Sequence, residues 1–167
     1  MSYYGHKSKY KLSQKKITEY KRTMREIEKY CKENNIITVN KCLEVGDYML
    51  GAYENGRFFP IGNRSVDTKA DVGEIANDLY QDKKSFNKKY KKCLDNGIEL
   101  YVLVEQEIKS LNDILSWSSP HSKISGKMLY DMIDRVRKSY GVKFVFCRKE
   151  KVAQTIINIL CESEKAK

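Results

Sequence analysis

The sequence lacks any apolar run long enough to cross a membrane, and its N-terminus lacks the apolar core of a signal peptide. Its five cysteines are odd in number, widely scattered and never arranged as Cys-x-x-Cys, which argues against a disulfide framework and against a zinc cluster. We therefore expect no membrane partner and a reducing compartment, either the cytoplasm or, in a eukaryote, the nucleus.

Glycine-rich loops that cradle phosphates are also missing, because the stretch GAYENG (residues 51–56) follows no strand-to-helix junction. This argues against the dinucleotide-binding and nucleoside-triphosphate-binding classes. The two histidines, His6 and His121, are too isolated to support a zinc site or a histidine-dependent nuclease site. No internal repeat or low-complexity tract marks a domain boundary.

Acidic residues are scarce relative to basic ones: 22 against 32, for a net charge of +10. Such an excess favours polyanionic partners such as DNA, although a lysine-rich composition also occurs in proteins that never bind nucleic acid. Residues 1–16 contain no acid, and we predict a basic flexible arm there, either lying along a phosphate backbone or solvated as a tail. A single domain is predicted over residues 17–167.

Apolar periodicity predicts the elements of that domain. Two strands are joined by a hairpin at Glu54-Asn55-Gly56, a typical Asn-Gly turn. Later apolar runs, too short for helices, read as strands buried on both faces. Strands alternating with helices predict a three-layer α/β domain, a mixed sheet flanked by helices. The predicted helices cover residues 17–32, a long stretch ending at 95–97, 111–115, 127–140 and 152–160, and the predicted strands cover 38–52, 57–69, 98–106 and 142–147.

Three charged residues could converge at the end of the hairpin. Asp67 and Lys69 alternate along one strand and so share a face, and Asp47 follows Gly46 in the partner strand. Two carboxylates supply oxygen ligands for Mg²⁺, and a lysine can orient a nucleophile or stabilise an anionic transition state. This combination is suited to hydrolysing a phosphodiester. The simpler alternative is that Gly46-Asp47 is turn chemistry and that Asp-x-Lys has no function.

The order of these motifs resembles the XPF/Hef-type nuclease domain, a branch of the PD-(D/E)XK superfamily with a restriction-endonuclease-like fold. The resemblance covers residues 41–160 and rests on LEVGDY (43–48), VDTK (66–69), a long helix and LVE (103–105). It implies an endonuclease that cuts flap or branched DNA with Mg²⁺ or Mn²⁺, and a homodimer or heterodimer. Asp47 and Asp67 would then be metal ligands and Lys69 the catalytic lysine. Thr68 stands where the family has arginine, and Gly73 where it has a trailing aspartate.

Further residues are candidates beside this trio. Glu74 and Glu105 are additional candidate metal ligands, although an acid in a first helical turn or at a strand end needs no metal to explain it. A lysine run either contacts DNA phosphates or is a solvated helix face. The departures from the family pattern leave a second function open: a degenerate nuclease fold that binds DNA or another protein. The candidate DNA-binding lysines are Lys83, Lys84, Lys88, Lys89, Lys91 and Lys92.

Overall fold

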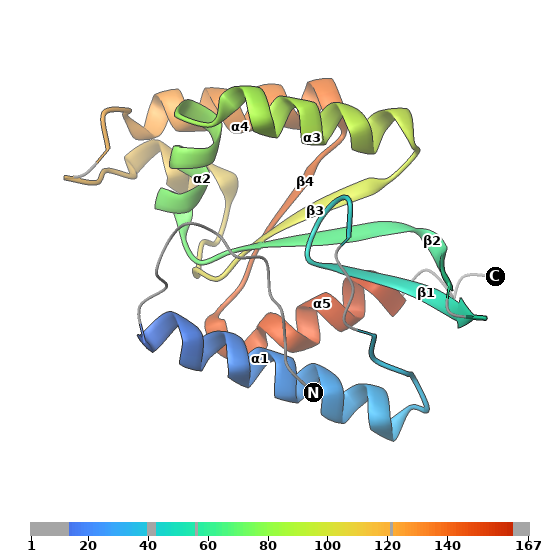
Figure 1. The fold of residues 1–167 in the computed structure, drawn as a ribbon. Helices are drawn as coiled ribbons and strands as arrows, with labels where there is room; N and C mark the ends of the chain where they lie inside the picture. The colour runs from blue at the N-terminus through green and yellow to red at the C-terminus, as the bar shows by residue number, and fades with distance from the viewer. Residues whose placement is uncertain (1–13, 40–42, 56, 121, 162–167) are drawn as a thin grey trace. The chain divides into compact units, whose positions relative to one another are not determined.

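The computed structural model describes residues 14–39, 43–55, 57–120 and 122–161, and it divides the chain into two compact units, residues 1–44 and 45–167 (Figure 1). Most of the predicted arm, both histidines and Gly56 lie outside the described residues. The arm and the single domain over 17–167 therefore stay predictions. In the part of the chain that is described, no helix has the length and apolarity needed to cross a membrane.

The first unit contains helix α1 (Gln14–Glu33), which starts three residues before the predicted helix. It ends where the sequence predicted, at Asn34-Asn35. Asn35 takes a left-handed conformation with a φ of 57°, and the Ile36 amide donates to the Cys31 carbonyl at 2.7 Å. This pattern closes a helix by satisfying its last carbonyls, and asparagine tolerates the left-handed turn.

The second unit is built on a four-stranded mixed sheet in the order β1-β2-β3-β4. Strands β1 (Tyr48–Glu54) and β2 (Arg57–Lys69) form the predicted antiparallel hairpin. Strands β3 (Glu99–Val104) and β4 (Lys143–Phe146) extend the sheet in parallel, β3 beside β2 and β4 beside β3. The parallel strands therefore end at one common edge, where β2 reaches Lys69.

Helices cover both faces of this sheet, with α3 (Lys83–Asp95) and α4 (Gly126–Tyr140) on one side and α5 (Val152–Cys161) on the other (Figure 1). Helix α2 (Val72–Tyr80) connects β2 to α3, and two short 3₁₀ helices, η1 (Leu111–Ser116) and η2 (Lys149–Lys151), precede α4 and α5. The prediction of a three-layer α/β domain is confirmed. Its main core lies between the sheet and α2 to α4 and includes Ile75, Tyr90, Leu100, Val102, Val104, Leu129 and Ile133.

Two predicted elements are wrong in extent. The strand predicted over residues 38–52 begins only at Tyr48, because the chain bends over residues 44–47 with Gly46 at a φ of 70°. The long helix after Lys69 is two helices, interrupted at Gln81-Asp82. The amides of both residues donate to the Asn77 carbonyl, and Asp82 then accepts from the first turn of α3. This break lets α2 and α3 reach the sheet from different directions.

Gly46 provides a stability prediction with a matched control. A Cβ at Gly46 would collide with the Ser65 hydroxyl and lie 2.8 Å from the Val66 carbonyl oxygen, whereas Gly97 has a similar φ of 65° and open space around it. Gly97→Ala is expected to cost about 1 to 2 kcal/mol through its left-handed backbone alone. Gly46→Ala is expected to cost about 1 to 3 kcal/mol more through steric overlap. Urea unfolding measures both, and equal losses would contradict the close approach.

Candidate functional site

Asp67 and Lys69 lie side by side at the carboxyl end of β2, on the face that α2 and α3 cover. Both are buried, with 5% and 8% of their surfaces exposed. The Lys69 Nζ atom is 3.1 Å from Asp67 Oδ2, as the alternation of side chains along a strand predicted. Charged groups this deeply buried require partners, and further partners come from the two helices.

One partly buried acid from α2 and one partly buried lysine from α3 complete a group here called the charge cluster: Asp67, Lys69, Asp78 and Lys89. Lys69 Nζ is 2.9 Å from Asp78 Oδ2, and Lys89 Nζ is 2.6 Å from Asp67 Oδ1. The Phe86 ring lies 5.0 and 5.3 Å from the Lys69 and Lys89 ammonium groups, within the range of cation–π attraction. The charge cluster alternates in sign from Lys89 through Asp67 and Lys69 to Asp78.

The electrostatics of the charge cluster favour its ionised form at Asp67 and Lys69. Burial raises the pKa of Asp67, but the ammonium groups of Lys69 and Lys89 outweigh it and hold that pKa below its usual value. Burial likewise opposes the charge on Lys69, yet Asp67 and Asp78 raise its pKa above the ordinary lysine value. At Asp78 burial outweighs Lys69, so the pKa of that carboxyl is raised.

Two carboxylate oxygens in the charge cluster lack a hydrogen bond. Asp67 Oδ2 and Asp78 Oδ2 are fully buried, and their contacts with Lys69 are ion pairs without hydrogen-bond geometry. Buried carboxylate oxygens that rest on one ion pair and no well-formed hydrogen bond are unusual, and they suit a site that takes on another ligand. Such an oxygen on Asp67 suits a hard cation.

Asp47 lies just before β1 and faces the strand that carries the charge cluster. Its amide donates to the Val66 carbonyl at 2.7 Å, and its Oδ2 accepts from the amide and hydroxyl of Thr68 at 2.8 and 2.7 Å. Neither Lys69 nor Lys89 forms an ion pair with Asp47. The structure thus brings Asp67 and Lys69 into contact and holds Asp47 against the residue between them. A cation shared by Asp47 and Asp67 stays a prediction.

The two additional candidate ligands, Glu74 and Glu105, lie beside the end of β2. Glu74 Oε2 accepts from the Ala70 amide at 2.9 Å, while its Oε1 is 3.9 Å from Lys69 Nζ. Asp71 caps α2 by accepting from the Glu74 amide. The Glu105 amide donates to the Lys69 carbonyl at 2.8 Å, which places its backbone beside the charge cluster. Metal binding by Glu74 or Glu105 stays a prediction.

The predicted DNA-binding lysines of α3 differ in exposure. Lys89 is partly buried and paired with Asp67, so in this structure it belongs to the charge cluster rather than to the helix surface. DNA binding by all six lysines stays a prediction. The five on the surface are Lys83, Lys84, Lys88, Lys91 and Lys92.

The fit to Mg²⁺ rests on few ligands. Across the described ranges, no group of three or more histidine, cysteine, aspartate or glutamate side chains is placed to hold a metal ion. Mg²⁺ needs fewer, because it keeps several waters and takes one or two carboxylates together with substrate phosphates. Asp67 offers one such carboxylate once Lys89 leaves Oδ1, while Asp47, just before β1, has one oxygen engaged by Thr68 and the other left for a ligand.

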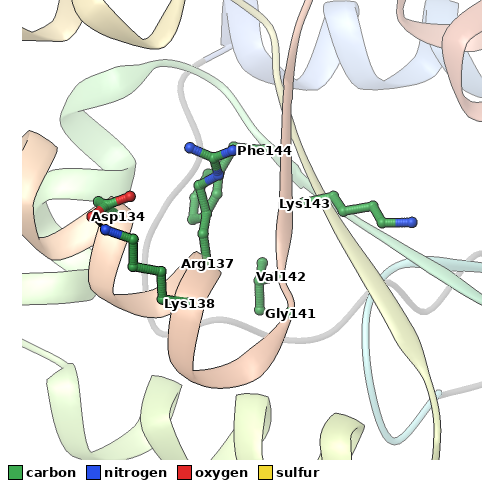
Figure 2. Close-up of a pocket in the computed structure, with 7 residues that line it drawn as sticks. All are labelled: Asp134, Arg137, Lys138, Gly141, Val142, Lys143 and Phe144. Atoms are coloured by element: carbon green, nitrogen blue, oxygen red, sulfur yellow. Dashed lines mark ion pairs between the residues drawn. The ribbon is translucent and has the colours of Figure 1, made fainter.

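A surface cavity of about 380 Å³ lies at the opposite end of the parallel strands and contains none of the predicted site residues (Figure 2). Lys138 pairs with Asp134 at 2.6 Å. Lys143 extends away from the other lining side chains (Figure 2). Its Nζ contacts Glu99 and Tyr101, both at 3.1 Å. The charges lining this cavity are thus largely paired within the protein.

Solved structures with a similar arrangement of sheet and helices identify the fold as XPF-like, as predicted. The solved structures that share it include XPF from Aeropyrum pernix, with a TM-score of 0.59 and 12% identity over 86% of this chain and 59% of that one. They also include XPF from Aeropyrum pernix in complex with DNA, with a TM-score of 0.55 and 14% identity over 87% of this chain and 63% of that one.

This similarity concerns the fold. The chain spans about three-fifths of the length of those XPF chains. No protein-family model matches the sequence, and no curated protein matches it. Dimerisation, which the resemblance implies, stays a prediction.

Proposed function

We propose that the protein is a DNA endonuclease that depends on Mg²⁺ or Mn²⁺ and prefers flap or branched DNA. The observation that carries the proposal is the Asp67–Lys69 pair, buried at the carboxyl end of β2 in an XPF-like nuclease fold. Burying this pair requires desolvating both ions, so stability alone is a weak reason to have it. A catalytic use accounts for its position at the edge where the parallel strands end.

Each side chain has a defined role in this proposal. Asp67 and Asp47 would hold the cation, which when bound activates water and neutralises negative charge on the phosphate. Lys69 orients the attacking water, whose oxygen forms a bond to phosphorus as one ester bond breaks. Lys89 must first leave Asp67 Oδ1, because its ammonium lies 2.6 Å from that oxygen. A DNA phosphate is a suitable new partner for Lys89.

DNA would approach along the exposed lysines of α3. Lys84, Lys88 and Lys91 recur at helical spacing on one face, so they can follow a phosphate backbone without reading bases. Lys89 lies on the same helix and reaches inward. Helix α3 would thus contact the DNA phosphates with its exposed lysines and reach the charge cluster with Lys89.

One observation favours a second function, a DNA- or protein-binding module without catalysis. Both oxygens of Asp67 are already paired with lysines, so internal cations satisfy the carboxylate without a metal. In that case binding would be indifferent to chelators.

The proposal is tested by incubating the purified protein with labelled fork, flap and linear duplex DNA. We expect cutting with Mg²⁺ or Mn²⁺ that stops when EDTA is added, while DNA binding measured by fluorescence anisotropy persists. Binding that is unchanged by EDTA and never accompanied by cutting in either metal would support the binding module instead.

A further inference from the structure

A second cavity, of about 540 Å³, is connected to the candidate site through Glu105 and Gln106. Its lining begins where β3 ends. Gln106 forms part of the wall, and its Oε1 accepts from the Val72 amide at the start of α2, at 3.0 Å. The preceding residue, Glu105, is bonded through its amide to the Lys69 carbonyl. The lining residues are Gln106, Glu107, Ile108, Lys109, Asp113, Ile114 and Trp117.

Trp117 is the one aromatic residue that lines this cavity, and it is partly buried against the core. Its backbone is fixed at both its amide and its carbonyl. The Trp117 amide donates to the Ile114 carbonyl at 2.9 Å, which closes η1. At the other end of η1, Ser110 and Asp113 form a capping box. Gly126 packs so closely that a Cβ there would collide with the Ile114 carbonyl and lie 2.7 Å from the Trp117 oxygen. Trp117 is therefore preorganised.

The two acids of the cavity are already engaged. Asp113 Oδ2 accepts from the Lys109 and Ser110 amides at 3.0 Å each, and Glu107 pairs with Arg148 Nη2 at 2.7 Å. A cation is thus a poor candidate ligand. What remains for a ligand is an aromatic face, the Gln106 carboxamide and the Lys109 ammonium. Together these groups recognise a flat, hydrogen-bonding molecule that carries a negative charge.

We propose that this cavity binds the base of one unpaired nucleotide next to the phosphate that is cut, with the base stacked on Trp117 and its phosphate near Lys109. The inference rests on the proposed function, because it assumes that DNA reaches the charge cluster. The volume of the cavity lies within the range of small-molecule sites. Bases within a duplex have both faces stacked on neighbours, so only an unpaired base can stack on an indole. The cavity would thereby select forks and flaps over linear duplex.

Trp117 is the sole tryptophan of the chain, so its fluorescence reports this cavity directly. In EDTA, to prevent cutting, we expect a fork with an unpaired arm to quench the emission and a blunt duplex to leave it nearly unchanged. A fork whose arm carries abasic sites near the junction is expected to bind without quenching. A fork that binds while the emission stays constant would overturn the inference.

Variants test the same point without relying on tryptophan emission. By anisotropy of labelled DNA, Trp117→Ala is expected to bind the fork about tenfold more weakly than wild type, with little change for the duplex. Trp117→Phe keeps an aromatic face and should retain most of the fork affinity. Equal losses for fork and duplex would contradict stacking while leaving the nuclease proposal intact. Absence of DNA binding by the wild type would overturn both proposals.

Discussion

Replacing Asp67 with asparagine is expected to abolish metal-dependent cleavage, reducing the rate at least about a hundredfold. Asparagine keeps the size of the side chain but removes the negative charge that would hold the cation. It also leaves Lys89 without the carboxylate that lies 2.6 Å from its ammonium. Cleavage of a labelled fork in Mg²⁺ measures the loss of activity, and calorimetry with Mn²⁺ measures the loss of cation binding. An unchanged cleavage rate would remove Asp67 from the site.

Two further variants show whether the Asp67→Asn effect is specific. Asp95→Asn removes an exposed carboxylate at the end of α3 and should cut at the wild-type rate. Lys89→Met removes the competing ammonium and leaves Asp67 in place, so Mn²⁺ binding without DNA should become tighter. Weaker Mn²⁺ binding by Lys89→Met would mean that Lys89 supports the cation site rather than blocking it.

The stability of Asp67→Asn should depend on pH in a defined direction. The pKa of Asp67 is below its usual value in the folded protein, so its ion pairs stabilise the fold above the pKa of an unfolded aspartate, about 4. That stabilisation is lost as the pH falls further. The gap in unfolding free energy between wild type and Asp67→Asn should therefore narrow below about pH 4.

Local sequence patterns predicted the scaffold of the site well. The Asn55-Gly56 turn and the alternation along residues 57–69 predicted the hairpin, and the same alternation placed Asp67 beside Lys69. The break between α2 and α3 was not predicted, because Leu79 and Phe86 are two helical turns apart and keep the apolar stripe in phase. Neither glycine nor proline marks the break at Gln81-Asp82.

The remaining members of the charge cluster depend on tertiary geometry. Asp78 reaches Lys69 and Lys89 reaches Asp67 only because α2 and α3 approach β2 from different directions after that break. One signal was present in the sequence: Asp78 lies one helical turn after Glu74, on a helix that directly follows the Lys69 strand. The lysine run did not indicate that Lys89 joins the charge cluster, because Lys88 and Lys89 are chemically identical. Only the orientation of α3 points Lys89 toward Asp67 and leaves Lys88 exposed.

Replacing Lys69 with methionine is expected to abolish cleavage and also to destabilise the protein by about 3 to 5 kcal/mol at neutral pH. Methionine fills a similar volume but leaves the buried Asp78 carboxylate without the ammonium 2.9 Å away. The pKa of Asp78 is already raised by burial, and losing Lys69 raises it further. Stability lost through a raised carboxyl pKa returns as the pH falls and the group binds a proton, so the deficit should be smaller at low pH.

The double variant Lys69→Met/Asp78→Asn separates the structural role of Lys69 from the catalytic one. Neutralising Asp78 removes the unpaired buried charge, and Lys89 still pairs with Asp67, so most of the lost stability should return. Cleavage should stay abolished, because no ammonium then lies beside Asp67 Oδ2 to orient the attacking water. Urea unfolding and fork cleavage measured on the same preparations decide the question. Recovery of both stability and cleavage would mean that Lys69 serves the fold alone.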